Sequence, residues 1–166
     1  MLFAKLRVAL AALLALAVLG LGAGGVAYHA LAADAPAAAK EGGAKGDLDK
    51  LQGTWLIVSM EMGGKKAPED EVKGYTFVVK DDKATLSDGK GLTQEAVLKL
   101  DPGKDPKEID MAVDEGGKNE VHKGIYKLEG DTLTLCKSHP PDERPGAFAT
   151  KEGEKWPALV VFKKKK

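Results

Sequence analysis

The chain has 166 residues, with 25 Lys and Arg against 25 Asp and Glu, three His and one Cys. This length suits a single domain. A formal net charge of zero excludes a nucleic-acid binder that works through general electrostatics. The single cysteine excludes an intramolecular disulfide framework and a zinc site made of several cysteines.

The hydrophobic residues are concentrated near the start of the chain, where 31 of the first 46 residues are apolar. Lys5 and Arg7 form a basic start, and residues 8–19 are an uninterrupted apolar run. Ala30-Leu31-Ala32 then gives the small-x-small pattern that is typical of signal-peptide cleavage. Residues 1–33 therefore predict an export segment.

The alternative for this segment is an uncleaved membrane anchor. Residues 8–27 carry no charge over 20 residues, which is long enough to span about 30 Å of hydrocarbon. Basic residues precede the apolar run, so both interpretations export the rest of the chain. We expect the domain in the periplasm, in the cell envelope or outside the cell, with membrane contact only through this segment.

Residues 34–50 predict a flexible linker. The segment is a low-complexity mixture of Ala, Gly, Lys and Asp, a composition typical of tethers. The alternative is a short alanine-rich helix. The folded domain is then expected over residues 51–166.

The sequence of the domain predicts a series of short strands separated by turns. A helix is expected only over residues 68–73. Apolar residues alternate with polar ones in several segments, and Asp, Gly and Pro mark the turns. Eight strands at this spacing indicate an all-β fold, either an antiparallel sandwich or a small up-and-down barrel. They are expected over residues 55–60, 75–80, 84–87, 96–100, 109–113, 125–128, 133–137 and 159–162.

One motif at the start of the domain resembles the Gly-x-Trp signature of lipocalin-type barrels, with Gly53 and Trp55 as its residues. The segment over residues 47–163 also resembles an uncharacterised domain family that is abundant in planctomycete bacteria. The matching motifs are LQGTW (51–55), LDPGKDPKEID (100–110), GIYKLEGDTLTLC (124–136) and ERPGAF (143–148). The resemblance implies a lipocalin-like β-barrel of exported proteins, in which Trp55 closes one end. It implies no activity, ligand or catalytic residue.

Few residues in the domain carry metal-binding or catalytic chemistry. His122, Cys136 and His139 could together hold zinc with an open position. We expect no metal or other cofactor, because Cys136 lies in a strand, where a free thiol is usually a small buried hydrophobe. His122 is expected to be a solvated imidazole beside charged neighbours. No sequence pattern pairs a nucleophile with a base, so we expect no enzymatic activity and no catalytic residue.

Three side chains are candidates for contacting a ligand: Tyr75, Tyr126 and Arg144. Arg144 is the only arginine after the export segment, which indicates that its planar guanidinium matters as well as its charge. The structural interpretation is that it stacks on an aromatic ring such as Trp55, or bonds carbonyls at a barrel end. The functional interpretation is contact with an anion at the barrel mouth.

Two functions remain open for a monomeric domain. One is a binding module that holds a small, partly apolar molecule inside the barrel. The other is a filled barrel whose loops contact an envelope or periplasmic protein. An interior cavity of about 300 Å³ or more would favour the first function, whereas a filled interior would reject it.

Overall fold

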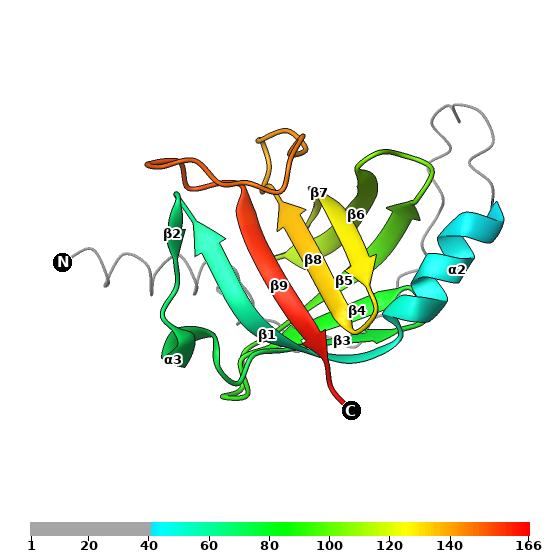
Figure 1. The fold of residues 1–166 in the computed structure, drawn as a ribbon, viewed down its shortest axis with the longest axis horizontal. Helices are drawn as coiled ribbons and strands as arrows, with labels where there is room; N and C mark the ends of the chain where they lie inside the picture. Colours follow the sequence, from blue (N-terminus) through cyan, green and yellow to red (C-terminus); the bar gives the residue numbers. More distant parts are fainter. Residues whose placement is uncertain (1–40) are drawn as a thin grey trace.

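The computed structural model describes residues 41–166, which form a β-barrel with two short helices (Figure 1). The predicted export segment and residues 34–40 of the predicted linker lie outside this range. The elements in chain order are α2 (Glu41–Leu51), β1 (Gly53–Met62), β2 (Lys65–Lys66), α3 (Glu69–Val72), β3 (Thr76–Lys80), β4 (Lys83–Ser87), β5 (Thr93–Asp101), β6 (Lys107–Glu115), β7 (Lys118–Glu129), β8 (Thr132–Lys137) and β9 (Ala158–Lys164).

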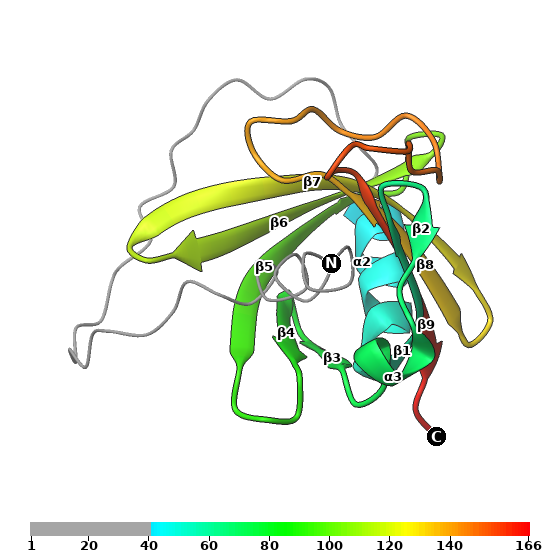
Figure 2. The same ribbon diagram turned by 90° about the vertical axis from the view of Figure 1, so that its left-hand side faces the viewer.

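Each long strand pairs antiparallel with the next one along the chain, and β1 also pairs with β9. The sheet therefore closes, and in Figure 2 its strands form a ring. Strand β2 only extends the β1 edge as a two-residue bridge. The prediction of a small antiparallel up-and-down barrel of about eight strands is confirmed, and each of the eight expected segments is a strand. The expected helix over residues 68–73 is the single turn α3.

A bulge in β1 changes which of its residues face the interior. Trp55 and Ile57 are buried before it, whereas Met60 and Met62 are buried after it. The pairing with β9 shifts register between Ile57 and Ser59, which inserts one extra residue and moves the buried set by one position. Both ends of this strand consequently supply large side chains to the core.

The prediction of a flexible linker is wrong for residues 41–50, which form most of helix α2. Asp47 is only 4% exposed, and its carboxylate accepts hydrogen bonds from Tyr126 (2.9 Å) and Lys107 (2.6 Å) that satisfy it in this buried position. Leu51 at the end of the helix is also buried. The Ala/Gly-rich composition did not reveal that one carboxylate and one leucine dock this segment on the end of the barrel.

Gly53 and Trp55 connect the helix to the barrel. Gly53 has a φ of 111°, in a region that residues with a side chain rarely adopt, so glycine suits this junction. Two residues later Trp55 is fully buried, and its Nε1–H donates to the carbonyl of Leu51 at 2.7 Å. Trp55 therefore lies between the core and α2, at the end of the barrel that the helix covers.

Replacing Asp47 by Asn should destabilise the barrel, since Asn has no charge for Lys107 and its amide NH₂ cannot accept the Tyr126 hydroxyl. We expect a loss of about 1–3 kcal/mol in the free energy of unfolding, measured by denaturant titration. Asp49→Asn, on the exposed side of the same helix, is the matched control and should change it by no more than about 0.5 kcal/mol. Equal effects of both substitutions would contradict the docking role.

Asp47 should also make stability depend on pH. Burial alone raises the pKa of Asp47, but the hydrogen bonds from Lys107, Tyr126 and Lys50 outweigh it and leave the pKa below the ordinary 3.8. A lowered folded-state pKa gives stability that is complete above 3.8 and is lost as the pH falls through the folded value. The stability gap between the unchanged chain and Asp47→Asn should therefore narrow between about pH 6 and pH 2. A constant gap would show that the charge is unimportant.

Candidate functional site

The end of the barrel opposite α2 carries a group of polar side chains that point inward, which we call the mouth. Buried residues occur on both faces of β7 and β8, since Ile125 and Cys136 are buried between inward-facing neighbours. Every second side chain of β6, β7 and β8 faces the interior, and this alternation continues to the strand ends at this side. It places Glu115, Glu120, His122 and Lys137 on the interior face. His139 follows β8 by two residues and lies with them, since its ring centroid is 4.7 Å from that of His122.

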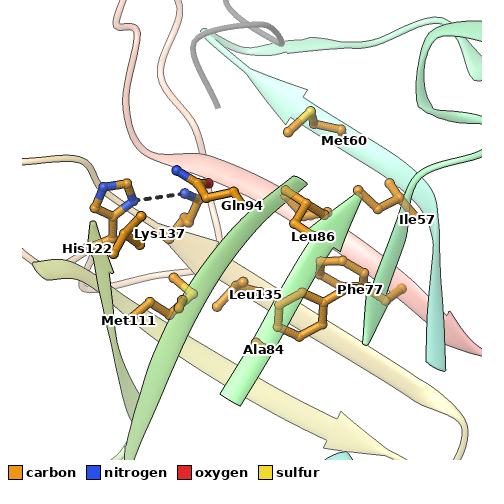
Figure 3. A pocket seen from close by; sticks show the side chains of 14 residues that line it. Ile57, Met60, Phe77, Ala84, Leu86, Gln94, Met111, His122, Leu135 and Lys137 are labelled. Carbon is orange, nitrogen blue, oxygen red and sulfur yellow. Dashed lines mark hydrogen bonds between the residues drawn. The ribbon is translucent and has the colours of Figure 1, made fainter. Parts of the chain in front are cut away.

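Beneath the mouth lies a small cavity inside the barrel (Figure 3). It measures about 50 Å³ and is apolar except for three polar side chains at one end, Gln94, His122 and Lys137. Its volume is well below the 300 Å³ or so of an ordinary ligand pocket, so the expectation of a small molecule held wholly inside the barrel is wrong. Side chains fill most of the interior, including Phe77 and Phe162, whose ring centroids are 5.3 Å apart.

Lys137 and His122 form a buried pair at the polar end of this cavity. They are 8% and 2% exposed, and Lys137 Nζ lies 3.1 Å from His122 Nδ1, the contact drawn in Figure 3. Burial lowers the pKa of Lys137 to about 8, although Glu115 raises it. Burial, the charge of Lys137 and the neighbouring His139 lower the pKa of His122 to about 3. His122 is therefore a neutral imidazole at neutral pH.

The other side of His122 faces carboxylates. Its Nε2 lies 3.2 Å from Glu115 Oε1 without making a hydrogen bond. His139 Nε2 lies 3.4 Å from Glu115 Oε2 and 3.9 Å from Glu120 Oε2. Two imidazoles and two carboxylates thus converge on one point, a set of groups that could hold a metal ion.

The loop over residues 138–157, drawn in orange in Figure 1, borders the mouth. It carries His139 and Trp156, whose rings stack with centroids 5.5 Å apart. Lys137 Nζ also lies 5.4 Å from the centre of the Trp156 ring. Trp156 is 9% exposed and packs beside Lys137, which is 8% exposed, whereas the His139 side chain is 26% exposed.

Comparison with protein-family models, with curated proteins and with solved structures finds no match to this chain. Within residues 41–166, no helix has the length and apolar character needed to cross a membrane. Function must therefore be argued from the geometry of the mouth.

The structure brings two of the three expected metal-ligating residues together and separates the third. His122 is buried at the mouth, so the prediction of a solvated imidazole is wrong. Cys136 is fully buried as predicted, but the alternation of β8 turns it away from the interior. Its Sγ lies 3.8 Å from the carbonyl of Ala149, and burial raises the thiol pKa to about 11. The groups that lie beside His122 and His139 are therefore Glu115 and Glu120, and not Cys136.

The three expected ligand-contacting residues lie away from the cavity. Tyr126 is 1% exposed, and its hydroxyl donates to Asp47 at the α2 end. Burial and this carboxylate raise the pKa of Tyr126 far above its usual range. Tyr75 packs against the core just before β3, and burial raises its pKa too, helped by Asp88 and Glu71. Neither tyrosine contributes to the lining of the cavity.

Arg144 bonds carbonyls on the barrel wall, as one branch of the structural interpretation expected. Its Nη1 donates to the carbonyls of Ile109 (3.1 Å) and Gly124 (2.6 Å), and its Nη2 donates to Asp110 Oδ1 (2.7 Å). Its Nε lies 3.3 Å from Glu108 Oε2. The guanidinium thereby fixes the loop over residues 138–157 to β6 and β7.

The sequence did contain a signal for the missed residues. Leu133 and Leu135 face the interior of β8, so the same period of two places Lys137 inside as well. On β6 the inward-facing residues are Ile109, Met111 and Val113, so the same period places Glu115 inside as well. A polar residue that continues an inward apolar series is the pattern that could have identified the mouth.

Replacing Arg144 by Lys should lower the thermal unfolding midpoint, because an ammonium cannot span two carbonyls and two carboxylates as the planar fork does. A loss of about 1–3 kcal/mol is expected from unsatisfied groups of this kind. Lys151→Ala, which removes an exposed ion pair with Glu154, should leave the midpoint nearly unchanged. Calorimetry of both variants provides the measurement. An unchanged midpoint for Arg144→Lys would contradict the anchoring role.

Proposed function

We propose that this protein is an exported, non-enzymatic binding domain that takes a small, partly apolar molecule at the mouth of a β-barrel. The observation that carries the proposal is the buried ammonium of Lys137 at the polar end of an apolar cavity. The export part rests on the signal-like residues 1–33, and the planctomycete family resemblance supports the lipocalin-like setting.

The hydrogen bonding of Lys137 supports an acidic or strongly accepting ligand. An ammonium has three N–H donors, while within residues 41–166 the Lys137 side chain has one hydrogen-bond contact, with Nδ1 of His122. A buried charge with incomplete hydrogen bonding is costly. A ligand carboxylate would satisfy the two remaining donors, and its hydrocarbon part would occupy the apolar space beneath.

The size of the cavity limits this ligand. About 50 Å³ accommodates the tip of a short chain, so the rest of the molecule must lie at the mouth near Trp156. This arrangement differs from a deep lipocalin-type pocket. The proposal includes no reaction, since Cys136 faces away from the cavity and its pKa is raised.

The small volume also favours the second candidate, a filled barrel that contacts an envelope or periplasmic protein. Leu56, Val58 and Val78 are each more than a third exposed on the outer face of β1 and β3. Apolar side chains gathered on one outer face are a feature of interaction surfaces. This candidate becomes the better explanation if no small molecule binds.

A series of straight-chain carboxylates from acetate to octanoate tests the first candidate, with calorimetric titration of the full chain in mild detergent. Affinity should rise with chain length by about 0.8 kcal/mol for each buried CH₂ and then level off when the cavity is full. Lys137→Met should abolish binding, while Lys127→Met, on the exposed face of β7, should not.

Native mass spectrometry of the protein purified from its own host is the companion measurement, because a retained ligand would appear as a defined mass increment. No co-purifying molecule and no response to any carboxylate would reject the small-molecule function in favour of the interaction domain.

A further inference from the structure

Four side chains at the mouth place one potential ligand atom each within 4.8 Å of one another: Glu115, Glu120, His122 and His139. We propose that they form a binding site for a divalent transition-metal ion of the Zn²⁺ class. The site lies on the Nε2 side of His122, whereas the cavity and Lys137 lie on its Nδ1 side. The proposal therefore does not depend on the organic ligand discussed above.

Two of the separations between potential ligand atoms are close to those around a tetrahedral ion, while the set as a whole spans up to 4.8 Å. Zinc bonds of about 2.0–2.1 Å to nitrogen and oxygen place neighbouring ligand atoms roughly 3.3–3.4 Å apart. The observed separations are 3.2 Å from His122 Nε2 to Glu115 Oε1, 3.4 Å from His139 Nε2 to Glu115 Oε2 and 3.9 Å from His139 Nε2 to Glu120 Oε2. Small side-chain adjustments would complete the coordination.

The tautomer of His139 is fixed for ligation. Its Nδ1 lies 2.7 Å from the carbonyl oxygen of Pro140, which can only accept, so Nδ1 carries the proton. In the neutral ring Nε2 then presents a lone pair to Glu115 and Glu120. A lone pair aimed at two carboxylates is repulsive, and either a proton on Nε2 or a metal cation between these groups removes the repulsion. Backbone carbonyls commonly orient metal-binding histidines in this way.

Two buried atoms at the site lack hydrogen-bond partners. His122 is 2% exposed, and its Nε2 makes no hydrogen bond even though Glu115 is near. Glu120 Oε2 is likewise buried and makes none. Buried polar atoms are nearly always satisfied, so two unsatisfied atoms at one point indicate a missing partner. The charges also agree, because two carboxylates neutralise a divalent ion.

The donor set favours the Zn²⁺ class over Ca²⁺ or Mg²⁺. Imidazole nitrogen is a ligand of zinc and its transition-metal neighbours, while Ca²⁺ and Mg²⁺ prefer oxygen alone. Since Nδ1 of His122 faces the Lys137 ammonium, its Nε2 carries the ring proton. Ligation by Nε2 therefore leaves the His122–Lys137 pair with one proton fewer, which is released to solvent.

The test uses the full chain in mild detergent, stripped of metal with a chelator and titrated with ZnCl₂. Native mass spectrometry should show one bound ion. His139→Gln and Glu120→Gln should each weaken binding at least about 10-fold. Both residues are only partly buried, so these variants should fold. Glu129→Gln, an exposed acid on the same strand as Glu120, is the matched control and should bind like the unchanged chain.

Two further variants separate this site from its neighbours. Cys136→Ala should retain one zinc ion, and the Co²⁺-loaded protein should show no thiolate charge-transfer band. Lys137→Met should bind zinc at least as tightly as the unchanged chain, since it removes a nearby positive charge, although it should lose carboxylate binding. Retained zinc with lost carboxylate binding distinguishes the two proposals.

Three results would overturn the metal site. The first is no bound zinc at millimolar ZnCl₂, which would indicate that an imidazolium of His139 pairs with the carboxylates instead. The second is unchanged affinity in both His139→Gln and Glu120→Gln. The third is loss of binding in Cys136→Ala.

Discussion

The pairing of the first strand with the last one is the constraint on which the rest of the structure depends. Because β1 pairs with β9, the sheet has a closed interior, and every second residue of each strand must face it. A polar side chain that faces the interior can reach solvent only at an end of the barrel. The closure therefore determines where charged side chains gather, and the bulge in β1 keeps its two halves compatible with one core.

The two ends of the barrel differ in how completely their buried charged groups are hydrogen-bonded. At the α2 end Asp47 receives hydrogen bonds from Tyr126, Lys107 and Lys50, so its carboxylate is well satisfied. At the mouth, His122 Nε2 and Glu120 Oε2 make no hydrogen bond. A satisfied network rigidifies a fold, whereas an incomplete one costs free energy unless a ligand completes it. This contrast is why we assign stability to the first end and binding to the second.

Much of the fold was predictable because it depends on local pattern. Period-two alternation and turn residues located all eight barrel strands, and the burial of Cys136 followed from its place in a strand. The site was less predictable. The sequence predicted a solvated His122 because charged residues lie beside it, yet Lys123 points outward while His122 points inward together with Glu120. A helix was only the alternative for the segment of α2, and its docking was missed because it depends on Asp47 meeting Tyr126, 79 residues later in the chain.

The sequence by itself determined the strand number and the turns, since these follow from composition and short-range periodicity. The period of two also places Lys137 and Glu115 on the same side as the inward-facing apolar residues of their strands. That side becomes the interior only when the sheet closes into a barrel. Only the tertiary structure decided which polar residues meet. Glu115, Glu120, His122 and His139 come from two strands and a loop, and barrel closure and the anchoring of the loop by Arg144 bring them to one point.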